Sequence, residues 1–156
     1  MSGLLLRWIP ERSHCDLIVT AGALDLSHEL ETMVNICLWT DRRADPSDRL
    51  PSGDDDPRGW WGDLYSPVRG DRIGSRLWLR VPGRAFAGIE RTVRLDIIEA
   101  LQPLIEDKIV SRVEAEVHFP NPLLKNRLDA IVDLYRGDQL ALRLDYQRVW
   151  AEALAG

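Results

Sequence analysis

The strongest constraint on the fold is an alternation of apolar and polar residues in the last third of the chain. From 109 to 119, apolar or small residues stand at every second position, which leaves Val110 in phase with the charged residues. Two similar runs follow at 128–134 and 140–146, separated by the polar tetrapeptide 136–139. Because successive strand side chains point to opposite faces, period two predicts strands with one buried face. Arg-Gly-Asp-Gln is typical of a hairpin turn. The segment therefore predicts a three-stranded antiparallel meander.

Two helices are expected before this sheet. Ser27 is the predicted N-cap of the first, which should end near Asp41. The second should span about 87–107, and Pro103 is expected to kink or end it, because proline lacks a backbone N–H. Each segment has an apolar stripe at helical spacing. The stripes are Leu30, Met33, Val34, Cys37 and Leu38 in the first, and Ile89, Val93, Ile97, Leu101 and Leu104 in the second.

The remaining segments complete the predicted fold. Short apolar runs at 4–9 and 16–20 flank a turn and predict an N-terminal hairpin. Residues 75–79 suggest a short helix. The fold class is therefore α+β, with this hairpin, two main helices packed on one face of a small C-terminal antiparallel sheet, and a long irregular loop. We expect a single domain spanning 1–156.

The loop, residues 42–74, holds four prolines, five glycines and an acidic run, with neither a helical nor a strand period. Loops of this length are uncommon inside compact domains and are usually functional or disordered. This one also contains Trp60, Trp61 and Tyr65, and aromatic residues are scarce in disordered linkers. We therefore expect a long excursion that returns to the body through its aromatic side chains.

Composition and charge exclude several classes of function. The net charge of −5 argues against nucleic acid, because phosphate binding needs clustered Lys and Arg. No stretch approaches the ~18 apolar residues of a membrane helix, and the N-terminus lacks the basic and apolar regions of a signal peptide. Cys15 and Cys37 stand among apolar residues, which indicates buried thiols in a reducing cytosol.

Residues for catalysis or metal binding are sparse. None of the histidines, His14, His28 and His118, is spaced with a second ligand as in a zinc site, so all three are expected at the surface. The acidic run 54–56 is contiguous, whereas a calcium loop alternates its ligands. No phosphate-binding glycine loop is present. The sequence therefore predicts a non-enzymatic protein without catalytic residues, metal or cofactor.

Three segments in a fixed order carry a family resemblance: Leu-Trp-Thr-Asp-Arg-Arg-Ala at 38–44, Arg-Gly-Trp-Trp-Gly-Asp at 58–63, and Ile-Gly-Ser-Arg-Leu-Trp at 73–78. With the segment at 16–22, they resemble the GP46 family of Mu-like phage baseplate proteins. That family is similar to the wider sheath-initiator and wedge family of contractile tails. The wider family has Glu-Pro-Arg near the end of its long helix. Here Gln102-Pro103-Leu104 keeps only the proline, so no ion-pair role transfers.

The resemblance implies a structural component of the virion tail baseplate, assembled in the host cytoplasm in six copies. Its partners would be other wedge proteins and the tail tube and sheath proteins, and it would initiate the sheath. Strand addition to a free sheet edge is the expected means, with 109–118 and 139–147 as candidate edges. The expected partner-binding or loop-anchoring residues are Arg42, Arg43, Arg58, Trp60, Trp61, Asp63, Arg76 and Trp78.

Two alternatives stay open. Some members of the wider family are labelled lysozyme-like, which would imply a peptidoglycan-cleaving enzyme with two carboxylates ~5–10 Å apart. The other alternative is a cytosolic interaction adaptor unrelated to phages, with the Trp-rich loop as a clamp. Interfaces favour Trp and Arg, and the chain has 18 arginines against two lysines.

Overall fold

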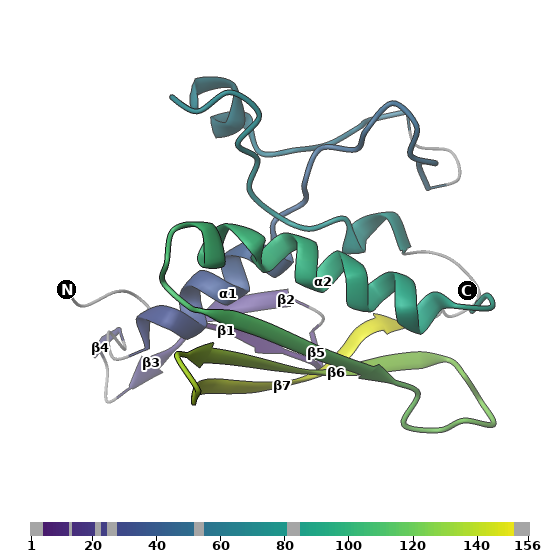
Figure 1. Ribbon diagram of the computed structural model, residues 1–156. Helices are drawn as coiled ribbons and strands as arrows, with labels where there is room; N and C mark the ends of the chain where they lie inside the picture. Colours follow the sequence, from purple (N-terminus) through teal and green to yellow (C-terminus); the bar gives the residue numbers. More distant parts are fainter. Residues whose placement is uncertain are drawn as a thin grey trace.

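The computed structural model describes residues 5–12, 14–20, 23–24, 28–51, 55–80 and 85–151. Its elements are β1 (Leu6–Ile9), β2 (His14–Leu17), β3 (Val19–Thr20), β4 (Ala23–Leu24), α1 (Glu29–Trp39), η1 (Trp61–Tyr65), η2 (Leu77–Arg80), α2 (Ile89–Glu106), β5 (Arg112–His118), β6 (Arg127–Arg136) and β7 (Gln139–Ala151). Figure 1 shows both helices on one side of the three-stranded sheet, with α2 along β5. The predicted α+β class is confirmed.

The C-terminal sheet has the order β5-β6-β7, and both pairs are antiparallel. Ala115 is buried on the face towards the helices, with Val113 and Val117 half-buried beside it, as the alternation predicted. Gly137, with φ +61°, sits in the predicted turn between β6 and β7. Val110 was expected to face outwards but is only 2% exposed. It precedes the strand, and its N–H donates to the Leu104 carbonyl in the turn after α2.

The central strand β6 is buried on its inner face and partly buried on its outer face. Its inner residues are fully enclosed: Leu128, Ala130, Val132 and Leu134. On the outer face, Asp129 and Asp133 are also buried. Asp133 tolerates this position because Arg143 of β7 donates to both of its carboxylate oxygens, each at 2.7 Å. A buried carboxylate needs such pairing, since an unpaired charge is costly away from water.

The last strand runs further than the predicted 140–146 because a bulge redirects it. The register shifts between Ala130↔Tyr146 and Leu128↔Trp150, which places extra residues in β7. Arg148 there has φ +57°, and its N–H donates to Oδ1 of Asp129 at 3.0 Å. Bulges bend a strand and re-aim its side chains. Beyond this one, Trp150 is buried in the core at 1% exposure.

The helices follow their predicted stripes. In α1, Val34, Cys37 and Leu38 are buried, and the five stripe residues of α2 are all buried. Ser27, the expected N-cap, lies outside the described residues; His28 precedes the helix and makes no side-chain cap bond. Pro103 does not end α2. The helix continues to Glu106, because only one backbone bond is lost in a final turn whose Leu104 packs into the core.

The N-terminal hairpin β1–β2 forms as predicted and packs against α1. The N–H of Leu6 donates to Oγ1 of Thr32 at 3.0 Å. Trp8 stacks on Trp39 of α1, with ring centroids 3.8 Å apart and planes 11° from parallel. The Nε1 of Trp8 donates to the Gln147 carbonyl at 2.8 Å. The hairpin thereby joins α1 to the bulged end of β7.

Candidate docking surface

The predicted long loop, residues 42–74 and called the arm below, stands away from the body beside α2 (Figure 1). Its two ends meet at the body, where Asp41 and Ser75 form a parallel β-bridge. Gly74 makes this meeting possible: its φ is +102°, and a Cβ there would lie 2.3 Å from the Thr40 carbonyl oxygen. Only glycine fits such a backbone angle and approach. The arm therefore leaves and re-enters the body at one point.

Ion pairs fix the base of the arm to α2. Nε of Arg76 lies 3.0 Å from Glu99 and its Nη1 lies 3.2 Å from Asp48, while Arg42 reaches the same Glu99 at 3.5 Å. Partial burial lowers the pKa of Arg76, but the carboxylates, Glu99 first, outweigh this effect and raise it above the ordinary value. Trp78 adds a hydrogen bond from Nε1 to the Arg42 carbonyl at 2.8 Å.

A second attachment involves Arg58. Its Nη1 is 2.9 Å from Asp41, and its guanidinium carbon lies 4.4 Å from the centroid of the Trp78 ring. Nη1 of Arg43 donates to the Arg58 carbonyl at 3.4 Å. The adjacent Gly59 has φ +105°, and a Cβ there would lie 2.7 Å from Cβ of Arg43. These contacts hold the two halves of the arm together.

The far part of the arm exposes apolar side chains. Trp60 is 45% exposed, Trp61 72%, Leu64 85%, Tyr65 79% and Val68 61%. We call these five residues the aromatic tip. Neighbouring rings contact each other, with centroids 5.5 Å apart for Trp60 and Trp61 and 6.3 Å for Trp61 and Tyr65. A contiguous exposed apolar patch marks an interaction site more often than scattered single residues do.

Two small features shape the tip. A Cβ on Gly62 would lie 2.2 Å from the Trp60 ring, so space is the constraint here, whereas backbone angle and space both constrain Gly59. Oδ1 of Asp63 accepts from the Ile73 N–H at 3.2 Å. Oδ2 of Asp63 is buried and has no hydrogen-bond partner among the described residues.

An open cavity of about 620 Å³ separates the aromatic tip from the body. Its walls come from α1, from the arm and from the end of α2, and they include Met33, Ile36, Trp61, Tyr65, Pro103 and Leu104. Most of these side chains are apolar, but Asp63, Asp71, Arg72 and Asp107 also line the cavity.

The structure divides the eight predicted site residues into two groups. Six lie where the arm is attached or folded: Arg42, Arg43, Arg58, Asp63, Arg76 and Trp78. The other two, Trp60 and Trp61, are exposed at the tip. Sequence reasoning missed the tip residues Leu64 and Val68, although their spacing of four was available as a signal. It also missed Glu99, which no local pattern connects to the arm.

Reactive chemistry has little support here. Within the described ranges, no three His, Cys, Asp or Glu side chains could hold a metal ion. Burial, with the charge of Glu31, raises the pKa of Cys15 to about 12, and burial raises that of Cys37 to about 11. Both thiols are free and stay protonated near neutral pH. Cys37 is buried as expected, and Cys15 is half-buried. Among the described helices, none is both long and apolar enough to cross a bilayer.

Comparison with known proteins gives consistent matches. The sequence profile of a family described as Phage protein GP46 matches residues 30–141. The chain is 49% identical over 86 residues to "Baseplate protein gp46" of Escherichia phage Mu, which covers 55% of this chain and 55% of that protein. It is 31% identical over 120 residues to "Mu-like prophage FluMu protein gp46" of Haemophilus influenzae, covering 77% and 78%. The aligned part thus spans about half of the Mu protein and most of the Haemophilus protein.

Proposed function

Because this chain belongs to the phage protein GP46 family, we propose that it is a structural subunit of a virion tail baseplate that acts by docking to other baseplate components. The observation that carries the proposal is the 49% identity to a Mu protein named for the baseplate. In finer terms, the partners are wedge, tube and sheath proteins around a contractile tail, six copies are present, and the subunit initiates the sheath.

The arm supports a docking role. Its base is fixed by paired arginines, so the aromatic tip is held in place before a partner arrives. Ordering a surface in advance lowers the entropy cost of association. Trp and Tyr at the centre of an interface contribute most strongly to binding. We assign Trp60 and Trp61 to partner contact, and Arg42, Arg58, Arg76 and Trp78 to holding the arm.

The sheet edges support strand addition. Both predicted edge segments belong to outer strands, since β6 lies between β5 and β7. α2 packs along β5, and Nε of Arg94 donates to the Ala115 carbonyl at 2.8 Å, so this edge is partly covered. The outer edge of β7 over 139–146 is the better candidate, because it lies on the side of the sheet away from β5 (Figure 1). An extended arm of a neighbour could continue the ladder there.

Co-expression with the proteins encoded beside it in the genome tests the docking role. We expect a stable complex that survives size-exclusion chromatography, with six copies by mass measurement. Failure to bind any of these proteins would contradict the docking proposal. Amide hydrogen exchange on the same complex tests strand addition separately. Slower exchange of alternate amides within 139–146 is expected, and unchanged exchange there would remove the strand-addition step alone.

The two alternatives have weaker support. The Mu relative is named a baseplate protein rather than an enzyme, and the family match favours a phage protein over an unrelated adaptor. Incubation with bacterial cell walls gives a direct check, because the structural role predicts no clearing of the suspension.

A further inference from the structure

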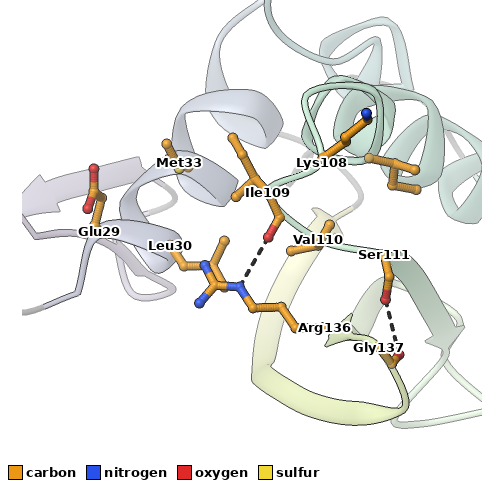
Figure 2. A pocket seen from close by; sticks show the side chains of 10 residues that line it. Glu29, Leu30, Met33, Lys108, Ile109, Val110, Ser111, Arg136 and Gly137 are labelled. Atoms are coloured by element: carbon orange, nitrogen blue, oxygen red, sulfur yellow. Dashed lines mark hydrogen bonds between the residues drawn. The ribbon is translucent and has the colours of Figure 1, made fainter.

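A second cavity, of about 760 Å³, lies between the start of α1, the end of α2 and the turn joining β6 to β7. Figure 2 shows its apolar walls, which include Leu30 and Met33 from α1 and Ile109 and Val110 from the connection after α2. We call it the basal pocket. It is open to solvent and lies on the same side of the body as the C-terminal end of α2.

Two cations line the basal pocket. Nε of Arg136 donates to the Ile109 carbonyl at 3.1 Å, which holds the guanidinium beside Leu30 (Figure 2). Lys108, with φ +59°, lies at the rim of the pocket, and its side chain points away from Arg136 (Figure 2). Neither cation forms an ion pair with any described residue. Glu29 is the one carboxylate among the lining residues, so the pocket has an excess of positive charge.

The basal pocket adjoins the cavity beneath the arm. Met33 and Ile109 line both spaces, so their apolar side chains stand between the two. We call the two adjacent spaces together the groove. Its arm end carries the opposite charge, because Asp63 and Asp71 of the arm line it, whereas Asp107 lines it from the end of α2 next to Lys108. The other charged residue there, Arg72, is paired with an aspartate at 3.0 Å. The groove is thus apolar at Met33 and Ile109, with Arg136 on one side and Asp63 and Asp71 of the arm on the other.

This polarity specifies its occupant, and the inference rests on the proposed docking function. We infer that the groove binds one segment of another protein whose middle is apolar and whose end in the basal pocket carries Asp or Glu. The planar guanidinium of Arg136 can donate two parallel hydrogen bonds to such a carboxylate. The apolar middle of the segment covers Met33 and Ile109, and its other end lies beneath the aromatic tip. The acidic arm end favours Lys or Arg there, which fixes the direction of the segment.

Selection from a random peptide library against the immobilised full-length chain tests this chemistry directly. We expect enriched peptides with an apolar core, an acidic residue at one end and a basic residue at the other. The most enriched peptide is then synthesised with a fluorophore, and its affinity is measured by anisotropy. Met33→Glu and Arg136→Glu should each weaken it about tenfold or more, the effect of losing one well-placed interface contact. Lys108→Glu should act in the same direction as Arg136→Glu.

Controls separate a docking effect from a folding effect. Arg91→Glu makes the same charge change at an exposed position of α2 outside the groove and should leave the affinity unchanged. A peptide in which the acidic residue is replaced by Lys should bind the wild type weakly and recover affinity on Arg136→Glu. That recovery cannot come from an unfolded variant.

Several results would overturn the inference. They are enriched peptides that are basic at the Arg136 end, no enrichment, or affinities that the groove variants leave unaltered. Dimerisation of the chain alone that Met33→Glu abolishes would identify a second copy as the occupant, which also overturns it. The selection needs no tail protein, so its failure is distinct from failure of the baseplate proposal.

Discussion

Replacing Arg80 with methionine should lower the free energy of unfolding by about 3–5 kcal/mol, the usual cost of breaking a buried ion pair by removing one partner. Arg80 is the last residue of η2, which follows the arm in the sequence. It binds Asp96 of α2 through Nε at 2.7 Å and Nη2 at 3.0 Å. Asp96 is only 2% exposed. Hydrogen bonding to Asp96 raises the pKa of Arg80 against the opposing effect of burial. Methionine would preserve much of the packing while leaving a buried carboxylate unpaired.

Urea denaturation followed by tryptophan fluorescence measures this loss. Thermal unfolding gives a second measure: for a chain of this size each kcal/mol corresponds to about 2–4 °C in Tm, so Tm should fall by about 6–20 °C. The double variant Arg80→Met, Asp96→Leu should regain most of the loss, because removing both partners of a buried pair is often close to neutral. Arg91→Met, at an exposed site, should change stability by less than about 0.5 kcal/mol.

Two results would refute this reasoning. One is a loss below about 1 kcal/mol for Arg80→Met, within the range of an exposed salt bridge. The other is a double variant no more stable than the single one, which would mean that the cost comes from lost packing of the arginine stem rather than from the unpaired carboxylate of Asp96.

Three further predictions address other parts of the molecule. Gly62→Ala should displace the half-exposed Trp60 ring and shift the fluorescence maximum, at a cost of about 0.5–1.5 kcal/mol for an off-rotamer side chain; an unchanged spectrum would contradict it. The hydrogen bond from Arg143 lowers the pKa of Asp133, so its stabilisation is complete above the unfolded value of about 3.9 and disappears as pH falls through the lower folded value. Arg143→Met should therefore lower the urea midpoint at pH 6, and the difference from the wild type should shrink as pH falls below about 3.9; a constant difference would argue against this linkage. Cys37, with a pKa of about 11, holds about 0.1% thiolate at pH 8, so iodoacetamide should label it far more slowly in the folded protein than in urea. Equal labelling rates would show that the thiol is not protected by the fold.

Local periodicity was sufficient to predict most of the framework. The stripe from Ile89 to Leu104 identified α2 because tertiary packing and helical spacing select the same positions. The alternation around Ala115 likewise identified β5, and Gly137 marked the turn between β6 and β7. The motif segments identified the arm as the place of interest, since several of its arginines and tryptophans form the attachment.

The parts that escaped prediction depend on contacts between distant residues. Burial of Asp133 on the outer face of β6 requires Arg143 from the next strand. The bulge at Arg148 depends on a positive φ, which is uncommon for a residue other than glycine and is therefore not expected from the sequence. Which arginines hold the arm, and which aromatics remain free, was likewise hidden, because Glu99 lies 23 positions from Arg76.

The bridge between Asp41 and Ser75 gives the chain a modular construction. The segment that enters the arm lies against the segment that leaves it. The body therefore holds the arm at the same two residues, whatever sequence lies between them. The entropic free-energy cost of closing such a loop grows only by about 0.6 kcal/mol for each doubling of its length. Insertions or deletions in the arm can therefore change the surface that it offers for binding, while the helices and the sheet keep their packing.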